Sequence, residues 1–272
     1  MFAVAAVGAL AGARGAAATP APEALLQRAF DRTLNAPGVR SMELRIHRGG
    51  QLVSRRAFDI AYRREHDAAQ SLVRFTAPAY LRGHALLVLA TPTGASDTWL
   101  YQAEERRPRR VGATHKADAF YGSDLSFEDL EHQRYATWRV RRLPDDAADG
   151  ASHVVVEAVP PGGSQYDRLV VWIDAARTAV ARVDFHRGDG REPMKRLTVT
   201  LDGVAEEAGH LLVRHMRIEQ IGRDAWTDVE TRRIAVDPGI SPELFSASVL
   251  EREGDDLYEL ATRHARAPSG RR

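Results

Sequence analysis

The sequence predicts a mainly β protein: a curled antiparallel sheet that forms an incomplete, half-open β-barrel, with an N-terminal helix and a short helical lid covering its concave face. Three observations predict this fold. About a dozen short segments alternate apolar and polar residues, the period of a half-buried strand. The turns between them are short and rich in Gly, Pro and Asp, which favours hairpins and antiparallel pairing. A sheet of that size twists and curls.

The first eighteen residues have the pattern of an export signal. Residues 2–13 are small and apolar, Ala16-Ala17-Ala18 offers a cleavage site, and the run is too short to span a bilayer. No Lys or Arg precedes the apolar run, so the true start codon is expected further upstream, and a disordered Ala-rich terminus is the alternative. We expect a signal peptide at 1–18 and one domain at 19–272, periplasmic and not an integral membrane protein.

Residues 22–35 predict the N-terminal helix. Pro22 and Glu23 are typical of a first turn, and 36–38 (APG) ends the segment. Apolar residues recur at helical spacing, so one face needs a surface to cover; they are Leu25, Leu26, Ala29, Phe30 and Leu34.

From residue 39 the period changes to two. Gly49-Gly50 predicts a hairpin turn. Strands are expected around 42–46, 58–62, 73–75, 84–90, 99–101, 135–143, 153–159, 169–173, 180–186, 197–201, 211–218 and 226–236. One parity of the early strands should face the interior, together with one helix residue and one lid residue; this predicted set is Phe30, Leu44, Ile46, Phe58, Ile60, Tyr62, Phe75, Leu87, Leu89, Trp99, Tyr101 and Phe127. Alternation looks the same whether these residues line a cavity or fill a solid core, so the sequence leaves both alternatives.

Composition excludes several classes of protein. The formal charge is +1, which gives no global field toward nucleic acid, and the basic run 106–110 is expected to be a solvated strand. The chain has no cysteine, which excludes disulfides, thiolate metal sites, a cysteine nucleophile and a lipidated N-terminal cysteine. The chain has two lysines, Lys116 and Lys195, and all its other basic residues apart from histidine are arginines.

Carboxylates crowd the stretch FYGSDLSFEDLE at 120–131. If 126–132 were a helical turn, Glu128 and His132 would share a face and could begin a metal site, but no further ligand has recognisable spacing. Ser126 and Asp129 match a capping box instead. Nucleophile-elbow, P-loop and zinc-protease motifs are absent from the sequence. We therefore expect neither an enzyme nor a metal or other cofactor.

Three blocks of the sequence carry a resemblance to a known family. They are RFTAPAYLRGHALLVLATP (74–92), DTWLYQAEERRPRRV (97–111) and AFYGSDLSFEDLE (119–131), and the stretch PGISPELFSASVLER (238–252) matches the way such domains close. In order and spacing these blocks resemble the LolA-like outer-membrane lipoprotein-sorting proteins of bacteria. The expected Pro after Trp99-Leu100-Tyr101 is missing, and residues 253–272 have no counterpart and are expected to fray.

The resemblance implies a periplasmic carrier that holds acyl chains of a lipid or lipoprotein in an apolar interior. It also implies a lid, whose hinge and motif we place at Gly122, Ser123, Asp124, Asp129 and Leu130. Possible partners are an RND-type inner-membrane exporter or an outer-membrane acceptor. The alternative is an accessory subunit that docks on such an exporter and carries nothing. The sequence does not name the cargo.

Overall fold

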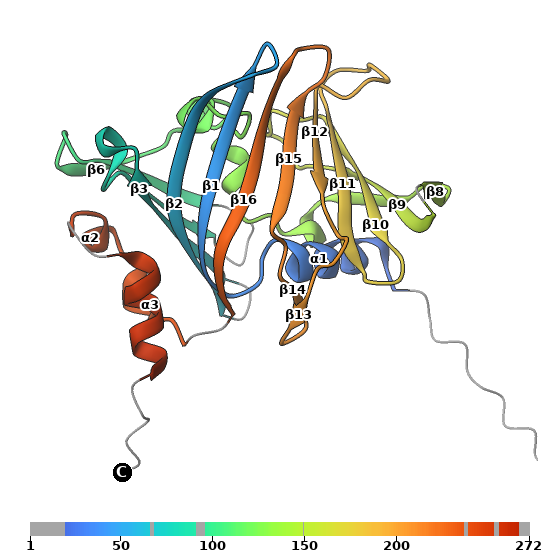
Figure 1. Ribbon diagram of the computed structural model, residues 1–272. Helices are drawn as coiled ribbons and strands as arrows, with labels where there is room; N and C mark the ends of the chain where they lie inside the picture. Colours follow the sequence, from blue (N-terminus) through green and yellow to red (C-terminus); the bar gives the residue numbers. More distant parts are fainter. Residues whose placement is uncertain are drawn as a thin grey trace, which may run out of the picture.

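Most of the chain forms one antiparallel sheet of fourteen strands that curls without closing (Figure 1). The computed structural model describes residues 20–65, 68–90, 96–148, 150–236, 239–252 and 256–266. Within these residues the predicted fold class is confirmed: a mainly β chain with a large open sheet and few helices. The signal peptide predicted at 1–18 lies outside the described residues. None of the helices described is long and apolar enough to span a membrane.

The first half of the sheet is a simple meander. Its strands are β1 (Gly38–Arg48), β2 (Gln51–Glu65), β3 (Ala68–Ala77), β4 (Ala85–Ala90), β5 (Ser96–Gln102) and β6 (Arg107–Arg110). Each strand pairs with the next in sequence, and β6 is one edge of the sheet. At the β1–β2 turn, Gly49 and Gly50 have φ of 57° and 72°, as the predicted hairpin requires.

The second half returns from the other edge. Its strands are β7 (Arg139–Arg142), β8 (Asp146–Ala148), β9 (Ala151–Val159), β10 (Arg168–Asp174), β11 (Ala179–His186), β12 (Lys195–Val199), β15 (His215–Gln220) and β16 (Ala225–Val236). The order from edge to edge is β6-β5-β4-β3-β2-β1-β16-β15-β12-β11-β10-β9-β7, with β8 paired to β9. A two-stranded hairpin, β13 (Glu206–Glu207) and β14 (His210–Leu211), stands apart from this sheet.

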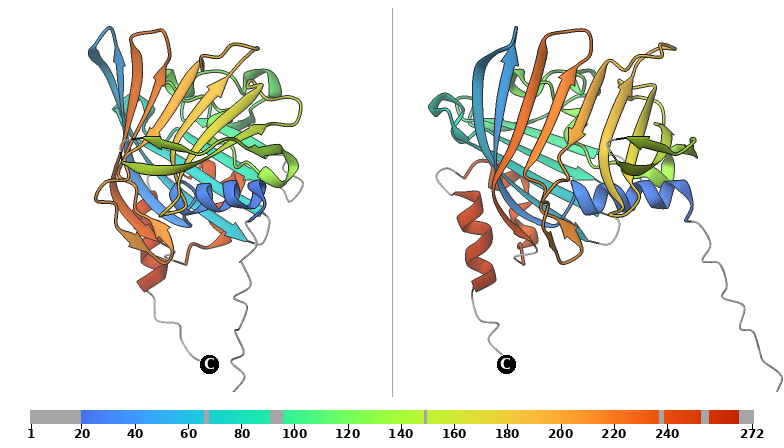
Figure 2. Two further views of the ribbon diagram at one scale, coloured as in Figure 1. Left: turned by 90° about the vertical axis from the view of Figure 1, so that its right-hand side faces the viewer. Right: turned by 45° about the vertical axis from the view of Figure 1, so that its right-hand side comes forward.

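The two edge strands are consecutive in the chain, so residues 111–138 must cross from one edge to the other. We call this stretch the crossing segment. It contains short 3-10 turns at Ala113–His115, Phe120–Gly122, Glu128–Leu130 and Tyr135–Thr137. Tyr135 was expected to begin a strand, but it opens a 3-10 turn, and β7 begins only at Arg139. In Figures 1 and 2 this green segment lies on the inner side of the curled sheet.

Helix α1 (Pro22–Thr33) covers the inner face of the second half, as predicted (Figure 2). Leu26 and Ala29 are fully buried in the inner core. Thr33 closes the helix by donating to the Ala29 carbonyl (2.7 Å) and accepting from the Val180 N–H of β11 (3.0 Å). The helix therefore docks through both apolar contacts and a backbone hydrogen bond.

The sheet has an apolar core on each face. Successive side chains of a strand point to opposite faces. In β4, Leu86 and Val88 belong to the inner core with α1, whereas Leu87 belongs to an outer core beneath the C-terminal segment. That segment comprises a 3-10 turn at Pro242–Leu244 and two helices, α2 (Ala247–Leu250) and α3 (Leu257–Arg266).

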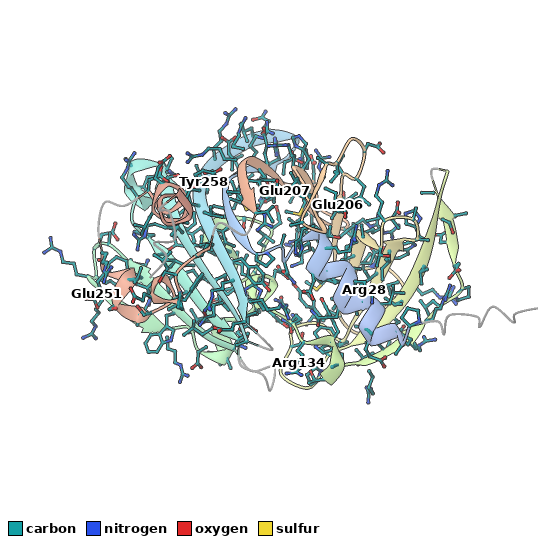
Figure 3. The ribbon with its side chains drawn as sticks, turned by 90° about the horizontal axis from the view of Figure 1, so that it is seen from below. Arg28, Arg134, Glu206, Glu207, Glu251 and Tyr258 are labelled. Carbon is teal, nitrogen blue, oxygen red and sulfur yellow. The ribbon has the colours of Figure 1, made fainter. Side chains whose placement is uncertain are left out.

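The frayed tail expected at 253–272 is wrong for residues 257–266. Leu257 and Ala261 of α3 are each 1% exposed in the outer core. The N–H of Tyr258 donates to the carboxylate of Asp59 in β2 at 3.2 Å. Asp256 caps the helix by accepting from the Glu259 N–H at 3.0 Å. Viewed from below, Tyr258 and its helix lie on the outside of the first half (Figure 3).

Candidate functional site

A partly open cavity of about 240 Å³ lies on the inner face, between the two halves of the sheet, α1 and the crossing segment. Most of its lining is apolar. The aliphatic and aromatic residues that line it are Phe30, Leu34, Met42, Leu44, Phe58, Ile60, Tyr62, Val73, Phe120, Leu125, Leu130, Tyr135, Trp138, Tyr166, Leu169, Phe185, Leu197, Val213, Met216, Ile218 and Val229. The polar residues of the lining are Thr33, Asn35, Arg40, Glu128, Asp129, Glu131, His132, Gln133, Lys195 and Thr231. A mainly apolar hollow with some polar groups is the usual form of a site for a small ligand.

Five of the twelve predicted interior residues line this cavity: Phe30, Leu44, Phe58, Ile60 and Tyr62. They come from α1, β1 and β2, where strict alternation identifies the inner face.

Three more predicted residues are on the inner side but do not line the cavity. Phe75 packs its ring against Phe58 (5.6 Å between centroids) and Phe120 (5.5 Å), behind the cavity wall. Phe127 makes an edge contact with Phe120 at 5.7 Å. Ile46 is 2% exposed and pairs with Thr227 in the sheet.

The other four predicted residues lie on the opposite face, which corrects the expected parity of β4 and β5. Leu87 and Tyr101 are buried in the outer core, and Leu89 and Trp99 pack against it. The apolar run 84–90 is buried on both faces, so its sequence has no alternation from which an inner parity can be read.

The corner expected to act as a hinge is fastened to the middle of the sheet. Tyr121 and Gly122 have φ of 49° and 77°, which turns the chain back sharply. The carboxylate of Asp124 accepts from Arg48 of β1 at 2.9 Å and from the Thr227 hydroxyl of β16 at 2.7 Å. The Asp124 N–H donates to the same hydroxyl at 3.0 Å. Any hinge motion here must break these bonds.

The turn that follows has the reciprocal hydrogen bonds of a capping box. The Ser126 N–H donates to Asp129 at 2.6 Å, and the Asp129 N–H donates to the Ser126 hydroxyl at 3.3 Å. Asp129 also accepts from Lys195 Nζ of β12 at 2.5 Å and from the Tyr166 hydroxyl at 2.7 Å. The Lys195 side chain is 4% exposed, and its ammonium lies over the Phe185 ring at 4.8 Å. One carboxylate therefore ties the turn to the second half of the sheet.

Two further carboxylates hold the same turn. Glu128 accepts from the Ser164 hydroxyl and from the Gln165 N–H (3.0 Å), in the connection before β10. Glu131 pairs with Lys116 at 2.8 Å, and burial raises the pKa of this carboxyl above its ordinary value. Both lysines of the chain thus bind carboxylates of the crossing segment.

His132 stands at the end of the cavity. Its ring lies 4.7 Å from that of Tyr62, and its buried Nε2 has no hydrogen-bond partner among the described residues. Burial lowers its pKa to about 3, so the imidazole is neutral at physiological pH.

A second hollow of about 330 Å³ adjoins this end of the cavity; we call it the vestibule. His132 and Gln133 line both spaces. The rest of the vestibule is lined by Ala21, Glu23, Ala24, Gln27, Arg64, Ala69, Ala90, Arg134 and Ala136. Figure 3 looks onto this end of the molecule, where Arg134 lies beside α1.

The arrangement does not assemble the metal pair considered from the sequence. Residues 128–130 form a single 3-10 turn and Glu131 is extended, so Glu128 and His132 do not share a helical face. Glu128 faces Ser164, whereas His132 packs on Tyr62. Among the described residues no three His, Asp or Glu side chains are grouped to hold a metal ion.

Sequence reasoning missed the part of the lining that comes from the second half of the sheet. Those residues alternate on strands that were expected, and they include Leu169, Phe185, Leu197, Ile218 and Val229. It also missed Lys195 and Tyr166, whose contacts with Asp129 span 66 and 37 residues of sequence. The one signal in the sequence was that lysine is rare, which could have drawn attention to Lys195.

Comparison with known proteins gives a family and a fold. Residues 67–252 match the model of a family described as "Uncharacterized protein". A solved domain described as an outer membrane lipoprotein-sorting protein, from Vibrio parahaemolyticus, has 25% identity and a TM-score of 0.77, covering 85% of this chain and 98% of its own. A DUF1329 family protein from Desulfovibrio piger has 24% identity and a TM-score of 0.76, covering 84% of this chain and 97% of its own.

A LolA superfamily protein from Nitrosomonas europaea shares the fold at 13% identity and a TM-score of 0.67, covering 84% of this chain and 98% of its own. The search of curated proteins finds no match. The resemblance drawn from the sequence blocks therefore agrees with the structural neighbours.

Proposed function

The chain belongs to the family whose model matches residues 67–252, and we propose that it is a carrier that holds acyl chains of a lipid or lipoprotein in the cavity between the two halves of its sheet. The observation that carries this proposal is the cavity itself: about 240 Å³ of space walled by apolar side chains from α1, both halves of the sheet and the crossing segment.

The energetics of such a site favour retention of a hydrocarbon chain. Each methylene moved from water into apolar surroundings gains about 0.8 kcal/mol, so a handful of them offset the cost of association. Because the crossing segment forms one wall of the cavity, its movement would widen the entrance for loading and release. The buried carboxylate contacts of Asp124 and Asp129 then set the free energy of opening.

We propose that the protein works in the periplasm. The signal peptide at 1–18 would direct its export and then be cleaved. We expect cleavage after Ala18 or within a residue or two of it, because Ala16-Ala17-Ala18 supplies small residues at the cleavage positions. N-terminal sequencing of the protein from the periplasmic fraction tests this. An intact Met1 in the cytosol would contradict it. An RND-type exporter or an outer-membrane acceptor would be the partner at which cargo is loaded or delivered.

A pair of size-increasing substitutions tests the carrier function. Ile60→Phe adds volume on the cavity wall, where there is room, so it should reduce uptake of a fluorescent fatty acid while costing less than about 1 kcal/mol of stability. Leu87→Phe is the matched control, because Leu87 is fully buried in the outer core; it should cost about 1–3 kcal/mol and leave uptake by the folded fraction unchanged.

Thermal unfolding and fluorescence titration of the three proteins give the result. Equal loss of stability in both variants, with no fatty acid bound by the parent, would leave the fold intact and remove the carrier function. The accessory subunit that docks on an exporter and carries nothing would then be the better reading.

A further inference from the structure

The size of the cavity and the residues at its His132 end narrow the class of cargo. Resting on the proposed carrier function, we propose that the ligand is a single-chain amphiphile whose one acyl chain occupies the cavity and whose anionic head lies in the vestibule, with His132 between the two.

The volume of the cavity limits the number of chains. A cavity of about 150 Å³ accommodates a benzene ring, so about 240 Å³ gives room for about ten chain carbons. A second chain of similar length would need twice that space. The crossing segment bounds the cavity through Phe120 and Leu130 and is fastened on both sides, so this is the size of the closed state.

His132 stands at the junction of the cavity and the vestibule. It lines both the cavity and the vestibule, and its Nε2 is buried without a partner among the described residues. A buried ring nitrogen left without a hydrogen bond costs free energy. A small rotation of the neutral imidazole would bring Nε2–H to an oxygen at the first polar position of the ligand, to which it would donate the missing hydrogen bond.

The vestibule offers guanidinium donors to an anionic head. Arg64 and Arg134 line it together with the single acid Glu23. Arg64 is held in place by Asp31 at 3.0 Å and by the Tyr62 hydroxyl at 3.0 Å, so its position does not depend on a ligand. At about 330 Å³ the vestibule is large enough for a carboxylate or a phosphate with its water. Carboxylate and phosphate share the chemistry that guanidinium groups recognise.

The predicted length of the acyl chain can be tested by titration calorimetry of the mature protein with hexanoate, octanoate, decanoate, dodecanoate and tetradecanoate. We expect affinity to rise about fourfold per methylene up to about ten carbons and then to level off. Decyl phosphate should bind at least as well as decanoate, whereas dioctanoyl phosphatidylglycerol, with two chains, should bind at least tenfold more weakly. Equal or tighter binding of the two-chain lipid would overturn the proposal.

Substitutions at the junction test the head. His132→Phe keeps a ring against Tyr62 but loses the polar atom. It should weaken the affinity for decanoate about tenfold and change the affinity for the uncharged probe phenylnaphthylamine by less than a factor of two. His132→Gln should recover most of the lost affinity for decanoate. Arg134→Gln should weaken decanoate and not decanol. Equal losses for both kinds of ligand would overturn the assignment of the head, while failure of every ligand to bind the parent would remove the carrier function itself.

Discussion

The buried pair Lys195–Asp129 offers the sharpest test of how the crossing segment is held. Replacing Lys195 by Met removes the ammonium 2.5 Å from the carboxylate, where the two side chains are 4% and 6% exposed. Removing one partner of a buried pair usually costs about 3–5 kcal/mol, because the other charge is left in poor solvent. Asp129 keeps the Ser126 N–H and the Tyr166 hydroxyl as donors, so we expect the lower end, about 3 kcal/mol.

The reverse change should cost more. In Asp129→Asn, Lys195 keeps its positive charge but loses the carboxylate that balances it, and only neutral acceptors, the amide oxygen and the Tyr166 hydroxyl, remain. The double variant leaves no unpaired charge, so its cost should fall well short of the sum of the two single variants. We expect a coupling free energy of about 2 kcal/mol from the cycle.

Urea unfolding followed by tryptophan fluorescence measures all four corners of this cycle. Arg142→Met is the control, because Arg142 and Asp145 also form an ion pair, at 2.8 Å, but their side chains are 42% and 48% exposed. This variant should cost less than about 1 kcal/mol. The reasoning is refuted if each single variant at Lys195 or Asp129 also costs less than about 1 kcal/mol, or if the two costs add.

Three further predictions follow from groups described above. Because burial lowers the pKa of His132 to about 3, the unfolded chain alone takes up this proton below pH 6.5; stability should fall by about 1.4 kcal/mol per pH unit as the pH drops toward 3, and urea midpoints at pH 7 and 5 should differ less in His132→Gln. Thr33→Val leaves the Val180 N–H without its acceptor and should cost about 1–3 kcal/mol by urea titration, whereas Thr33→Ser should cost less than half of that. Leu257→Ala should cost about 2 kcal/mol by thermal unfolding, since the side chain is 1% exposed, and an unchanged melting temperature would mean that α3 does not dock.

The sequence predicted those parts of the inner face where apolar and polar residues alternate. On β1 and β2, Leu44, Phe58 and Ile60 face the cavity as alternation requires. It could not predict β4, because a strand covered on both faces is apolar throughout, and Leu86 is then indistinguishable from Leu87. The outer face of the sheet is covered by the C-terminal segment, in which α2 lies against β4 and α3 lies against β1 and β2. Helix α3 had not been expected.

That helix did have a signal. Leu257, Leu260 and Ala261 recur at i, i+3 and i+4 after Asp256, which is the pattern of a capped amphipathic turn. The ion pairs and hydrogen bonds that hold the crossing segment could not be predicted in this way. The partners of Asp129 lie on β12 and before β10, and the side chain that meets a given carboxylate across a folded sheet depends on the curvature of the whole sheet.

The two open edges of the sheet bear on how the protein remains a separate molecule. An edge strand exposes unpaired backbone groups that invite another strand to join it, in a second copy or in the same chain. Here the edges read Arg107-Pro108-Arg109-Arg110 in β6 and Arg139-Val140-Arg141-Arg142 in β7.

Joining either edge would strip water from guanidinium groups that are now half or more exposed, such as Arg110 beside Asp97 and Arg141 beside Glu157. Pro108 also has no N–H to offer a new neighbour. The same arginines would repel one another if β6 and β7 approached within one chain. The arginines therefore disfavour pairing of the two edges with each other and stacking of separate molecules into fibres, so the sheet stays open.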